Sequence, residues 1–390
     1  IVSLGVAVIL FEGGLSLDIH GYRQTSRTIT RLLSLGAAVT WLTTALLTWL
    51  LFSFSPFFSL LAGSLVMVTG PTVITPLLRR IRANKNVHSI LHWESVLIDP
   101  IGVFVAVFCF DLVYQTNPAS ALTNFGLRLL TGTAVGTGVG LAAYAMINRA
   151  FIPEEHVTIF SLATALFTYG TCVWIIPESG LLGVVVAGFM LGIMQPEELE
   201  KIKKFKLDLT ETLIGMLFIL LSANLNLREF LNLGLKGVLL VTAVIVLIRP
   251  LAVFLSARGS GLAREEKLFL SWVAPRGIVA ASLASLFTLR LTQAGIPESA
   301  FLEVFTFSVV AVTVIIQGST AKRVATILQV RSPKQTGWLI IGAHRLAEQF
   351  SAFLQEKAGV YSIMINTNLR NIDGAQSHGC NAKQANALDA

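Results

Sequence analysis

Long runs of apolar residues constrain the fold of this chain more than any other feature. A helix needs about 20 apolar residues to cross about 30 Å of hydrocarbon, and most of the runs are that long. Only 13% of the residues are charged, against about 25% in a typical soluble domain. We therefore predict an all-α polytopic membrane protein. Its eleven predicted spans lie near residues 1–17, 29–53, 57–78, 88–114, 121–148, 157–175, 180–195, 210–226, 232–257, 267–289 and 299–321.

Basic residues in the loops between these runs set the orientation. Eighteen Lys and Arg residues fall in every second loop and after the last run, whereas the other loops hold only Arg228 and Arg290, with Lys236 just inside a run. Positively charged loops stay in the cytoplasm, so we expect a cytoplasmic C-terminus, residue 1 near the outside, and insertion in the inner (plasma) membrane. The net charge of +7 belongs to these loops and predicts no nucleic acid partner.

The last sixty residues have a different pattern. Residues 338–342 predict a short buried strand that ends in glycine, residues 344–357 have helical spacing, and residues 360–365 predict a second strand. This order is the start of a βαβ unit. We therefore expect a transmembrane domain over 1–330 and a cytoplasmic α/β domain over 331–390.

Asp99 is the most informative polar residue in the apolar runs. A charge in the middle of a membrane helix costs about 2.5–3.5 kcal/mol, and Asp99 lies about eleven residues into its span. Ser95 precedes it by four residues, which places both on one helical face. Carboxylate and hydroxyl oxygens suit a hard cation, and burial favours a protonated carboxyl. Cation and proton would then compete for Asp99; the alternative is a structural Asp paired with an Arg.

Glu94 and Arg249 lie at matching depths in two different apolar runs. Glu94 is in the same run as Asp99. Glu94 is five residues nearer the cytoplasm than Asp99, and Arg249 is in the cytoplasmic half of its own run. We predict a buried structural ion pair, because removal of either partner would leave an uncompensated charge.

Two runs carry helix breakers near the middle of the membrane. Gly70 lies among Thr69, Pro71 and Thr72, and Pro76 follows. Proline interrupts the helical hydrogen bonds, and non-helical backbone at this depth survives only inside protein or beside a water-filled cavity. The freed carbonyls and the hydroxyls of Thr69 and Thr72 are therefore candidate cation ligands. The alternative is a simple proline kink.

The second interrupted run contains Pro275, Arg276 and Gly277, about 205 residues later and in the opposite direction. Paired broken helices in two inverted repeats indicate a substrate site where they cross. Arg276 either balances the charge of the helix ends at this crossing or has a structural role.

These residues resemble the monovalent cation:proton antiporter-1 family, which includes bacterial sodium/proton exchangers. The resemblance rests on Leu10–Gly14, Glu94–Pro100, Arg249–Pro250 and Pro275–Gly277. It implies a thirteen-helix antiporter fold with a core domain and a dimerisation domain, a homodimer, and two helices before residue 1. It also implies that Asp99 binds the cation or proton with help from Ser95 and Thr69, and that Glu94 pairs with Arg249.

Two positions depart from the family pattern. Ile98 stands where the family has Asn, and Gly70 stands where many members have Asp. The transported ion is thus left open between Na⁺ and K⁺. Because one carboxylate remains at the crossing, we expect one-for-one, electroneutral exchange with H⁺.

The C-terminal segment resembles the amino-terminal half of a regulator of potassium conductance domain (TrkA-N-like). Gly342 to Ala347 stand where this Rossmann-like fold has its G-x-G-x-x-G turn, with His344 and Ala347 in place of two glycines. Asn366 stands where an acidic ribose ligand often ends the second strand. The resemblance implies a partial Rossmann-like domain with a regulatory nucleotide, NAD(H) or an adenine nucleotide, at Gly342 and Asn366. No cofactor is required for exchange.

The sequence leaves three candidate functions to distinguish. The first is an antiporter, which is a transporter and not an enzyme, with Na⁺ or K⁺, H⁺ and membrane lipid as its partners. The second is a cation channel with a nucleotide-sensing domain, but a channel needs a symmetric filter, and one titratable Asp favours obligate exchange. The third is a membrane oxidoreductase, but haem-spaced histidines and a flavin motif are not visible in the sequence. The three cysteines show no metal-ligand spacing, so we expect no metal beyond the transported cation.

Overall fold

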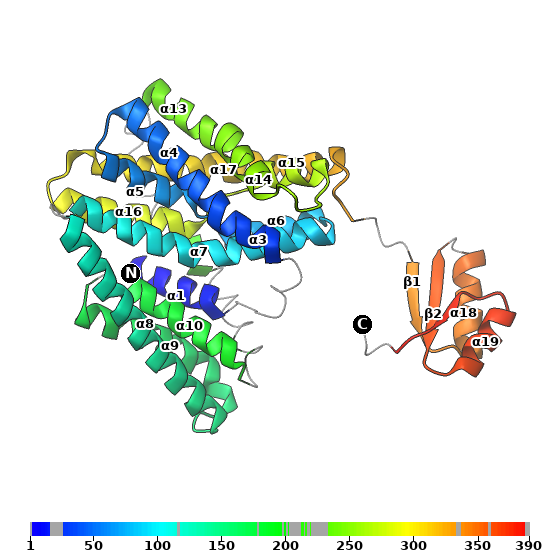
Figure 1. Cartoon of the computed structure of the whole chain (residues 1–390). Coiled ribbons are helices and arrows are strands. Elements are labelled where there is room, and N and C mark those ends of the chain that lie inside the picture. Colours follow the sequence, from blue (N-terminus) through cyan, green and yellow to red (C-terminus); the bar gives the residue numbers. More distant parts are fainter. Residues whose placement is uncertain are drawn as a thin grey trace. The chain divides into compact units, whose positions relative to one another are not determined.

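The computed structural model of the protein describes residues 2–15, 26–114, 118–177, 179–196, 233–332, 337–357 and 360–386, with a few single residues between 199 and 219. Its contacts divide the chain into two units, Ile1–Arg331 and Ser332–Ala390. The first unit is helical and the second is a small sheet with helices (Figure 1). The predicted span near 210–226 lies almost wholly outside the described residues.

Apolar helices build the first unit. Among the described residues, six helical segments are long and apolar enough to cross a membrane, and four shorter apolar helices accompany them. The helices are α1 (Val2–Leu15), α3 (Ser26–Arg31), α4 (Ala37–Phe52), α5 (Pro56–Met67), α6 (Pro71–Ile81), α7 (Lys85–Tyr114), α8 (Pro118–Asn148), α9 (Val157–Ile175), α10 (Gly180–Met194), α13 (Gly234–Ala243), α14 (Arg249–Ser256), α15 (Arg264–Trp272), α16 (Ile278–Gln293) and α17 (Ala300–Ile327).

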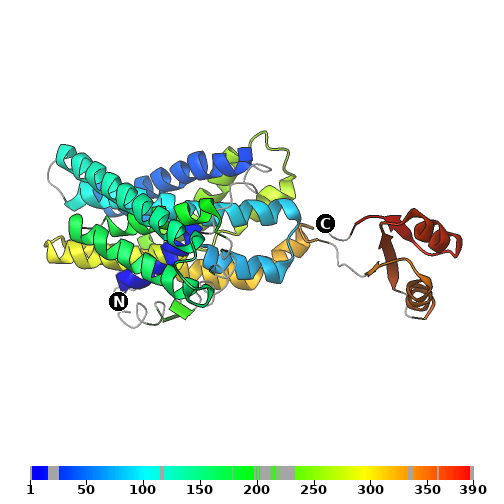
Figure 2. The same ribbon diagram turned by 90° about the horizontal axis from the view of Figure 1, so that it is seen from below.

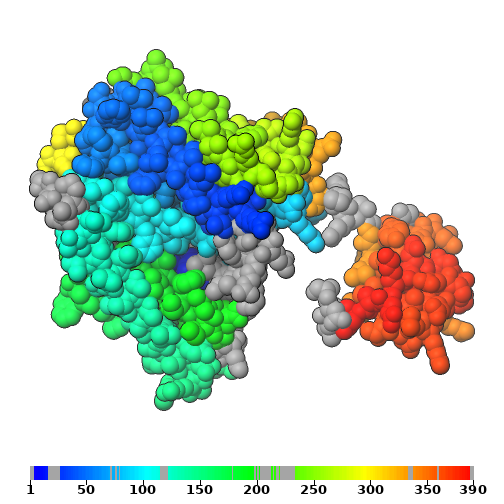
Figure 3. All heavy atoms as spheres, in the orientation of Figure 1, coloured from blue at the N-terminus to red at the C-terminus, as the bar shows by residue number. Residues whose placement is uncertain are grey.

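Two groups of helices are distinguishable in the first unit. Helices α1, α8, α9 and α10 lie together on one side, and α3 to α7 with α13 to α17 form the other group (Figures 1 and 2). On the face shown in Figure 3, α3 and α4 (blue) lie beside α7 and α8 (cyan to teal). Helix α4 exposes Leu42, Leu46 and Leu50, a row of large apolar side chains that suits contact with lipid.

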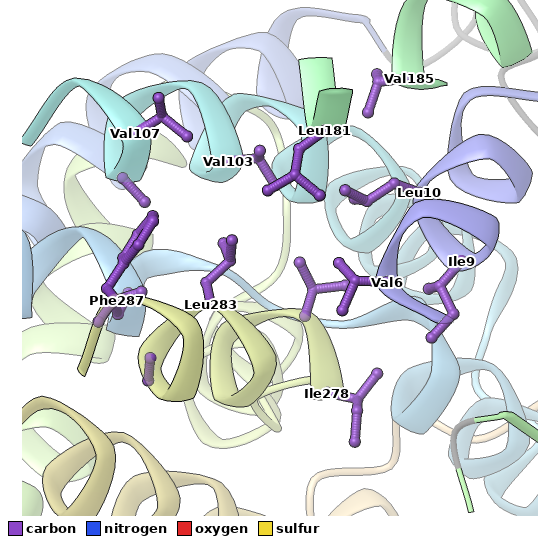
Figure 4. Close-up of a cluster of buried hydrophobic side chains, with 14 of the residues drawn as sticks. Val6, Ile9, Leu10, Val103, Val107, Leu181, Val185, Ile278, Leu283 and Phe287 are labelled. Atoms are coloured by element: carbon purple, nitrogen blue, oxygen red, sulfur yellow. The ribbon is translucent and has the colours of Figure 1, made fainter. Parts of the chain in front are cut away.

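One apolar cluster joins the two groups. Val6 and Leu10 of α1 and Leu181 of α10 lie close to Val103 of α7 and Leu283 of α16 (Figure 4). Because α7 and α16 belong to the second group, this cluster packs the side of α7 against the α1–α10 pair. It thereby fixes the position of the helix that carries Asp99.

Two π-helical turns interrupt otherwise continuous spans. The segment η1 (Leu32–Gly36) joins α3 to α4, and η3 (Val244–Ile248) joins α13 to α14. A π turn contains an extra residue per turn, so a buried face can continue past an insertion. The amphipathic pattern of the sequence did not predict either turn, because one inserted residue hardly changes the spacing of apolar positions.

The second unit is a three-stranded parallel sheet. Its strands β1 (Gly337–Ile341), β2 (Tyr361–Asn366) and β3 (Ala382–Gln384) lie in the order β1-β2-β3. Helix α18 (Arg345–Glu356) connects the first two strands, and α19 (Leu369–Ser377) precedes the third. The strand–helix–strand order expected over residues 338–365 is present, and α19 and β3 continue it.

Glycines bring α1 and α10 into backbone contact. A Cβ added at Gly188 would lie 2.2 Å from the carbonyl oxygen of Phe11, and one at Gly14 would lie 2.4 Å from that of Val185. Small residues allow this close approach between membrane helices. The packing of the apolar cluster between α1 and α10 therefore depends on glycine at positions 14 and 188.

We predict that Gly188→Ala destabilises the protein by about 1–3 kcal/mol, the usual cost of an added methyl group in a close-packed contact. The measurement is the melting temperature in detergent. Gly138→Ala is the matched control, because a Cβ at this helical glycine meets nothing within 4 Å. Equal melting temperatures for the two variants would contradict the close α1–α10 contact.

Candidate ion site

Both predicted helix breaks are present. Helix α5 ends at Met67, and residues 68–70 are not helical before α6 starts at Pro71. Helix α15 ends at Trp272, and residues 273–277 are not helical before α16 starts at Ile278. Proline has no N–H to donate and is best tolerated in the first turn of a helix, which is where Pro71 begins α6. Pro275 lies in the non-helical segment between α15 and α16, whereas Pro100 is accommodated inside α7.

The two breaks cross at a pair of glycines. A Cβ added at Gly277 would lie 2.5 Å from the Cα of Gly70. The backbones therefore touch, and a larger side chain at Gly277 would push the two extended segments apart. Gly70, which departs from the family pattern, lies at the contact itself.

Asp99 lies beside this crossing. Gly102 follows Asp99 by three residues on α7, and a Cβ there would lie 2.1 Å from Cγ2 of Val68. Ile98 packs in a cluster with Met67 and Val68 of the first break. Ile98 and Gly102 lie before and after Asp99 in the sequence, and both contact residues at the first break. The turn of α7 that carries Asp99 therefore faces the non-helical segment.

The Asp99 carboxyl group is buried without an ion-pair partner among the residues that the structure describes. Asp99 is 4% exposed, and its Oδ1 accepts no hydrogen bond. The Oγ1 of Thr69 is also buried and without a hydrogen bond. Both oxygens therefore have lone pairs that can accept a hydrogen bond or coordinate a cation.

Ser95 is fully buried one turn before Asp99. Its hydroxyl donates to the carbonyl oxygen of His92 at 2.9 Å, which leaves its lone pairs available to accept. The side chain of Thr72, the other predicted hydroxyl ligand, lies outside the described residues, although its backbone is in the first turn of α6.

Arg276 reaches from the second break to the first. Its Nη1 donates to the carbonyl oxygen of Met67 at 3.1 Å, one of the carbonyls left unpaired where α5 ends. A cation at the C-terminus of a helix is favourable for the helix dipole. The contact agrees with the charge-balancing alternative for Arg276, and it ties the two breaks together.

Two residues of α17 that were not predicted as site residues form hydrogen bonds with the second break. The Thr313 hydroxyl accepts from the backbone N–H of Arg276 at 3.3 Å, and Gln317 Oε1 accepts from the N–H of Ala274 at 3.0 Å. Both side chains are buried. The available signal was their spacing of four residues, which puts two polar groups on one face of an apolar span.

Glu94 and Arg249 form a buried bidentate ion pair. Arg249 Nη1 and Nη2 donate to the two carboxylate oxygens at 2.5 and 2.9 Å, and Nε donates to the carbonyl oxygen of Leu270 at 3.2 Å. Both side chains are buried. Since Glu94 precedes Asp99 by five residues, it faces a different side of α7. Arg249 is thus fully engaged by Glu94 and Leu270.

The predicted nucleotide residues meet at one edge of the second unit. Gly342 follows β1 with a φ of 105°, which favours glycine, and its N–H donates to the carbonyl oxygen of Ile365 at 2.8 Å. Asn366 ends β2 beside it, in register with the end of β1. The Nδ1 of His344 accepts the N–H of Ala347 at 3.0 Å, so a side chain already occupies one donor at the start of α18.

Comparisons with known proteins identify relatives of the first unit. The family model described as "Sodium/hydrogen exchanger, transmembrane" matches residues 1–327. The chain is 27% identical over 337 residues to the K(+)/H(+) antiporter NhaP2 of Shewanella oneidensis, covering 85% of this chain and 58% of that protein. It is 23% identical over 358 residues to the Probable Na(+)/H(+) antiporter 2 of Methanocaldococcus jannaschii, covering 84% of each.

A solved structure shows the fold. The sodium proton antiporter MjNhaP1 from Methanocaldococcus jannaschii at pH 8 has a TM-score of 0.72 at 23% identity, covering 84% of this chain and 85% of that one. The first unit therefore has the fold of a transporter rather than of an enzyme. The chain spans 58% of the length of its K(+)/H(+) antiporter relatives.

We predict that Glu94→Ala and Arg249→Ala each destabilise the protein by about 3–5 kcal/mol, the usual cost of leaving one buried charge without its partner. Thermal unfolding in detergent measures this. The double variant Glu94→Ala with Arg249→Ala should be less destabilised than the sum, because it leaves neither charge behind. Wild-type stability in both single variants would refute the structural role of the pair.

Proposed function

Since this chain belongs to the sodium/hydrogen exchanger family, we propose that it is a secondary antiporter that exchanges Na⁺ or K⁺ for H⁺, with Asp99 as the group for which the two compete. The observation that carries this proposal is the buried Asp99 carboxyl group, which has no ion-pair partner among the described residues and lies beside the crossing of two broken helices.

A buried carboxylate without a fixed counter-charge is unstable in its empty ionised form. Transfer of an unpaired charge out of water costs several kcal/mol. The Arg249 guanidinium, which could have neutralised Asp99, is held by Glu94. A proton or a monovalent cation would each supply the missing positive charge, and binding of one removes the negative charge that attracts the other. This exclusion links the two fluxes.

Oxygen atoms for the cation are available at the same place. Besides Asp99, we assign the hydroxyls of Ser95, Thr69 and Thr72 and the backbone carbonyls freed at the first break as its ligands. Hard monovalent cations prefer such ligands. Arg276, which donates to the Met67 carbonyl, would keep the two breaks in register while the cation enters and leaves.

The presence of a single assigned carboxyl group also supports electroneutral exchange. With one carboxyl group available for both ions, the loaded site carries the same charge with a proton as with a monovalent cation. Glu94 and Arg249 cancel each other in both states. The relatives include both a K(+)/H(+) and a probable Na(+)/H(+) antiporter, and we propose one of these two cations as the substrate.

The orientation and the assembly follow from the sequence and the family. We propose a homodimer in the inner membrane, with the second unit in the cytoplasm because the basic loops and the chain end share one side. We further propose that the second unit is a Rossmann-like regulatory domain. The left-handed turn at Gly342 and its neighbour Asn366 support this, and a nucleotide at that edge would regulate exchange without taking part in it.

We predict that Asp99→Asn abolishes cation-driven proton flux in proteoliposomes while the protein remains folded, because an amide can neither release a proton nor neutralise a cation. Glu298→Gln is the control; Glu298 is exposed in the short turn before α17, and exchange should persist. Proton flux at the wild-type rate in Asp99→Asn would refute the proposal.

We predict that an imposed membrane potential leaves the initial exchange rate unchanged, because no net charge moves in an exchange of one proton for one monovalent cation. The measurement is proton flux in proteoliposomes at zero and at about 100 mV, where one moved charge is worth about 2.3 kcal/mol. A rate that follows the potential would contradict electroneutrality, and a cation current without proton flux would favour a channel.

A further inference from the structure

After α17, the chain folds back onto the helical unit. After α17 ends at Ile327, Gln329 has a φ of 55°, and the N–H of Val330 donates back to the carbonyl oxygen of Ala325 at 3.1 Å. These two features reverse the direction of the chain. Residues 330 and 331 then lie along the segment between α6 and α7.

This returning segment is bonded to the α6–α7 connection. The N–H of Asn84 donates to the carbonyl oxygen of Val330 at 2.8 Å, and Ala83 forms an antiparallel bridge with Arg331. Arg331 Nε donates to the carbonyl oxygen of Ile81, the last residue of α6, at 3.1 Å. Ser332, the next residue, is the first of the second unit.

Glu266 extends these bonds to α15. It is 8% exposed. Its Oε1 accepts from Asn84 Nδ2 at 2.9 Å, and its Oε2 accepts from the N–H of Ala263 at the start of α15 at 3.0 Å. Asn84 Oδ1 in turn accepts from the N–H of Val87 in the first turn of α7 at 2.9 Å. A buried carboxylate needs such bonds to offset its desolvation.

We call Asn84, Glu266 and Arg331 the clasp. It joins the ends of three helices that form the candidate ion site: α7 carries Asp99, and α6 and α15 are halves of the two broken helices. By the orientation proposed above, all three ends are cytoplasmic. The clasp also holds the chain one residue before the second unit begins.

We propose that the clasp is a positioning device for the ion site. A change in Asn84, Glu266 or Arg331 would act on the ends of α6, α7 and α15, because direct hydrogen bonds connect these residues to the three helix ends. The residues of the clasp touch no ion; they set the geometry of the helices that do. The inference rests on the proposed role of Asp99.

The first test places like charges against each other in the clasp. Asn84→Asp keeps the acceptor for Val87 but puts a carboxylate where the 2.9 Å bond to Glu266 was. We expect the apparent affinity for the transported cation to fall at least about fivefold, the lower end of ordinary coupling between sites, in flux assays with full-length protein. Asn84→Asp with Glu266→Gln restores a donor and an acceptor, and should return the affinity to within about twofold of wild type.

The control is Asn148→Asp at the end of α8. This residue is exposed, and the substitution adds the same charge without touching the clasp, so no change is expected. Wild-type affinity in Asn84→Asp, or equal loss in Asn84→Asp and in the double variant, would overturn the positioning role. Exchange that survives Asp99→Asn would instead refute the proposed function on which the inference rests.

The second test removes the hydrogen bond that Arg331 donates to the carbonyl oxygen of Ile81. We expect Arg331→Ala to lower the apparent cation affinity in the wild-type background and to have no further effect in Asn84→Asp, because both substitutions open the same clasp. No change in the wild-type background, or losses that add in the combined variant, would overturn the positioning role.

Discussion

The structure depends on one buried carboxyl group that forms no ion pair among the residues that the structure describes. Asp99 lies beside the crossing of two broken helices. The two buried arginines of this region have other partners: Arg249 is held by both carboxylate oxygens of Glu94, and Arg276 donates to the carbonyl oxygen of Met67. Under the proposed function, a proton or a cation that comes and goes balances the charge of Asp99.

The packing of the molecule supports this arrangement at three levels. Contact between Gly70 and Gly277 lets two backbones meet where no side chain would fit. Arg276, Thr313 and Gln317 satisfy backbone groups that the breaks release. Around them, the apolar cluster of α1, α7, α10 and α16 holds the helix that bears Asp99.

Much of this could be predicted from the sequence because membranes impose strict rules. The length of each apolar run predicts a span, and Pro71 and Pro275 within two of the runs predicted the two breaks. The pairing of Glu94 with Arg249 was expected from matched depths, and the two side chains are in contact. The depth of a residue in the membrane follows from its position along its apolar run, so it can be estimated from the sequence.

Other features depend on three-dimensional contacts and were not predictable. The π turns before Ala37 and Arg249 change the spacing of apolar residues by only one position. The roles of Thr313 and Gln317 depend on which helix lies against the second break. The clasp joins residues 182 positions apart, Asn84 and Glu266, in segments that look like ordinary polar loops. In the second unit, the bond from Ala347 to His344 shows how a degenerate glycine turn is capped, which the motif alone did not indicate.

The central claim is that cation and proton exclude each other at Asp99, and it can be measured without transport. Cation is added to detergent-solubilised protein in weakly buffered solution, and the released protons are counted against the cation bound. The account predicts about one proton released per cation bound at a pH where Asp99 is protonated, and no release from Asp99→Asn. Cation binding without proton release, or equal release from Asp99→Asn, would contradict it.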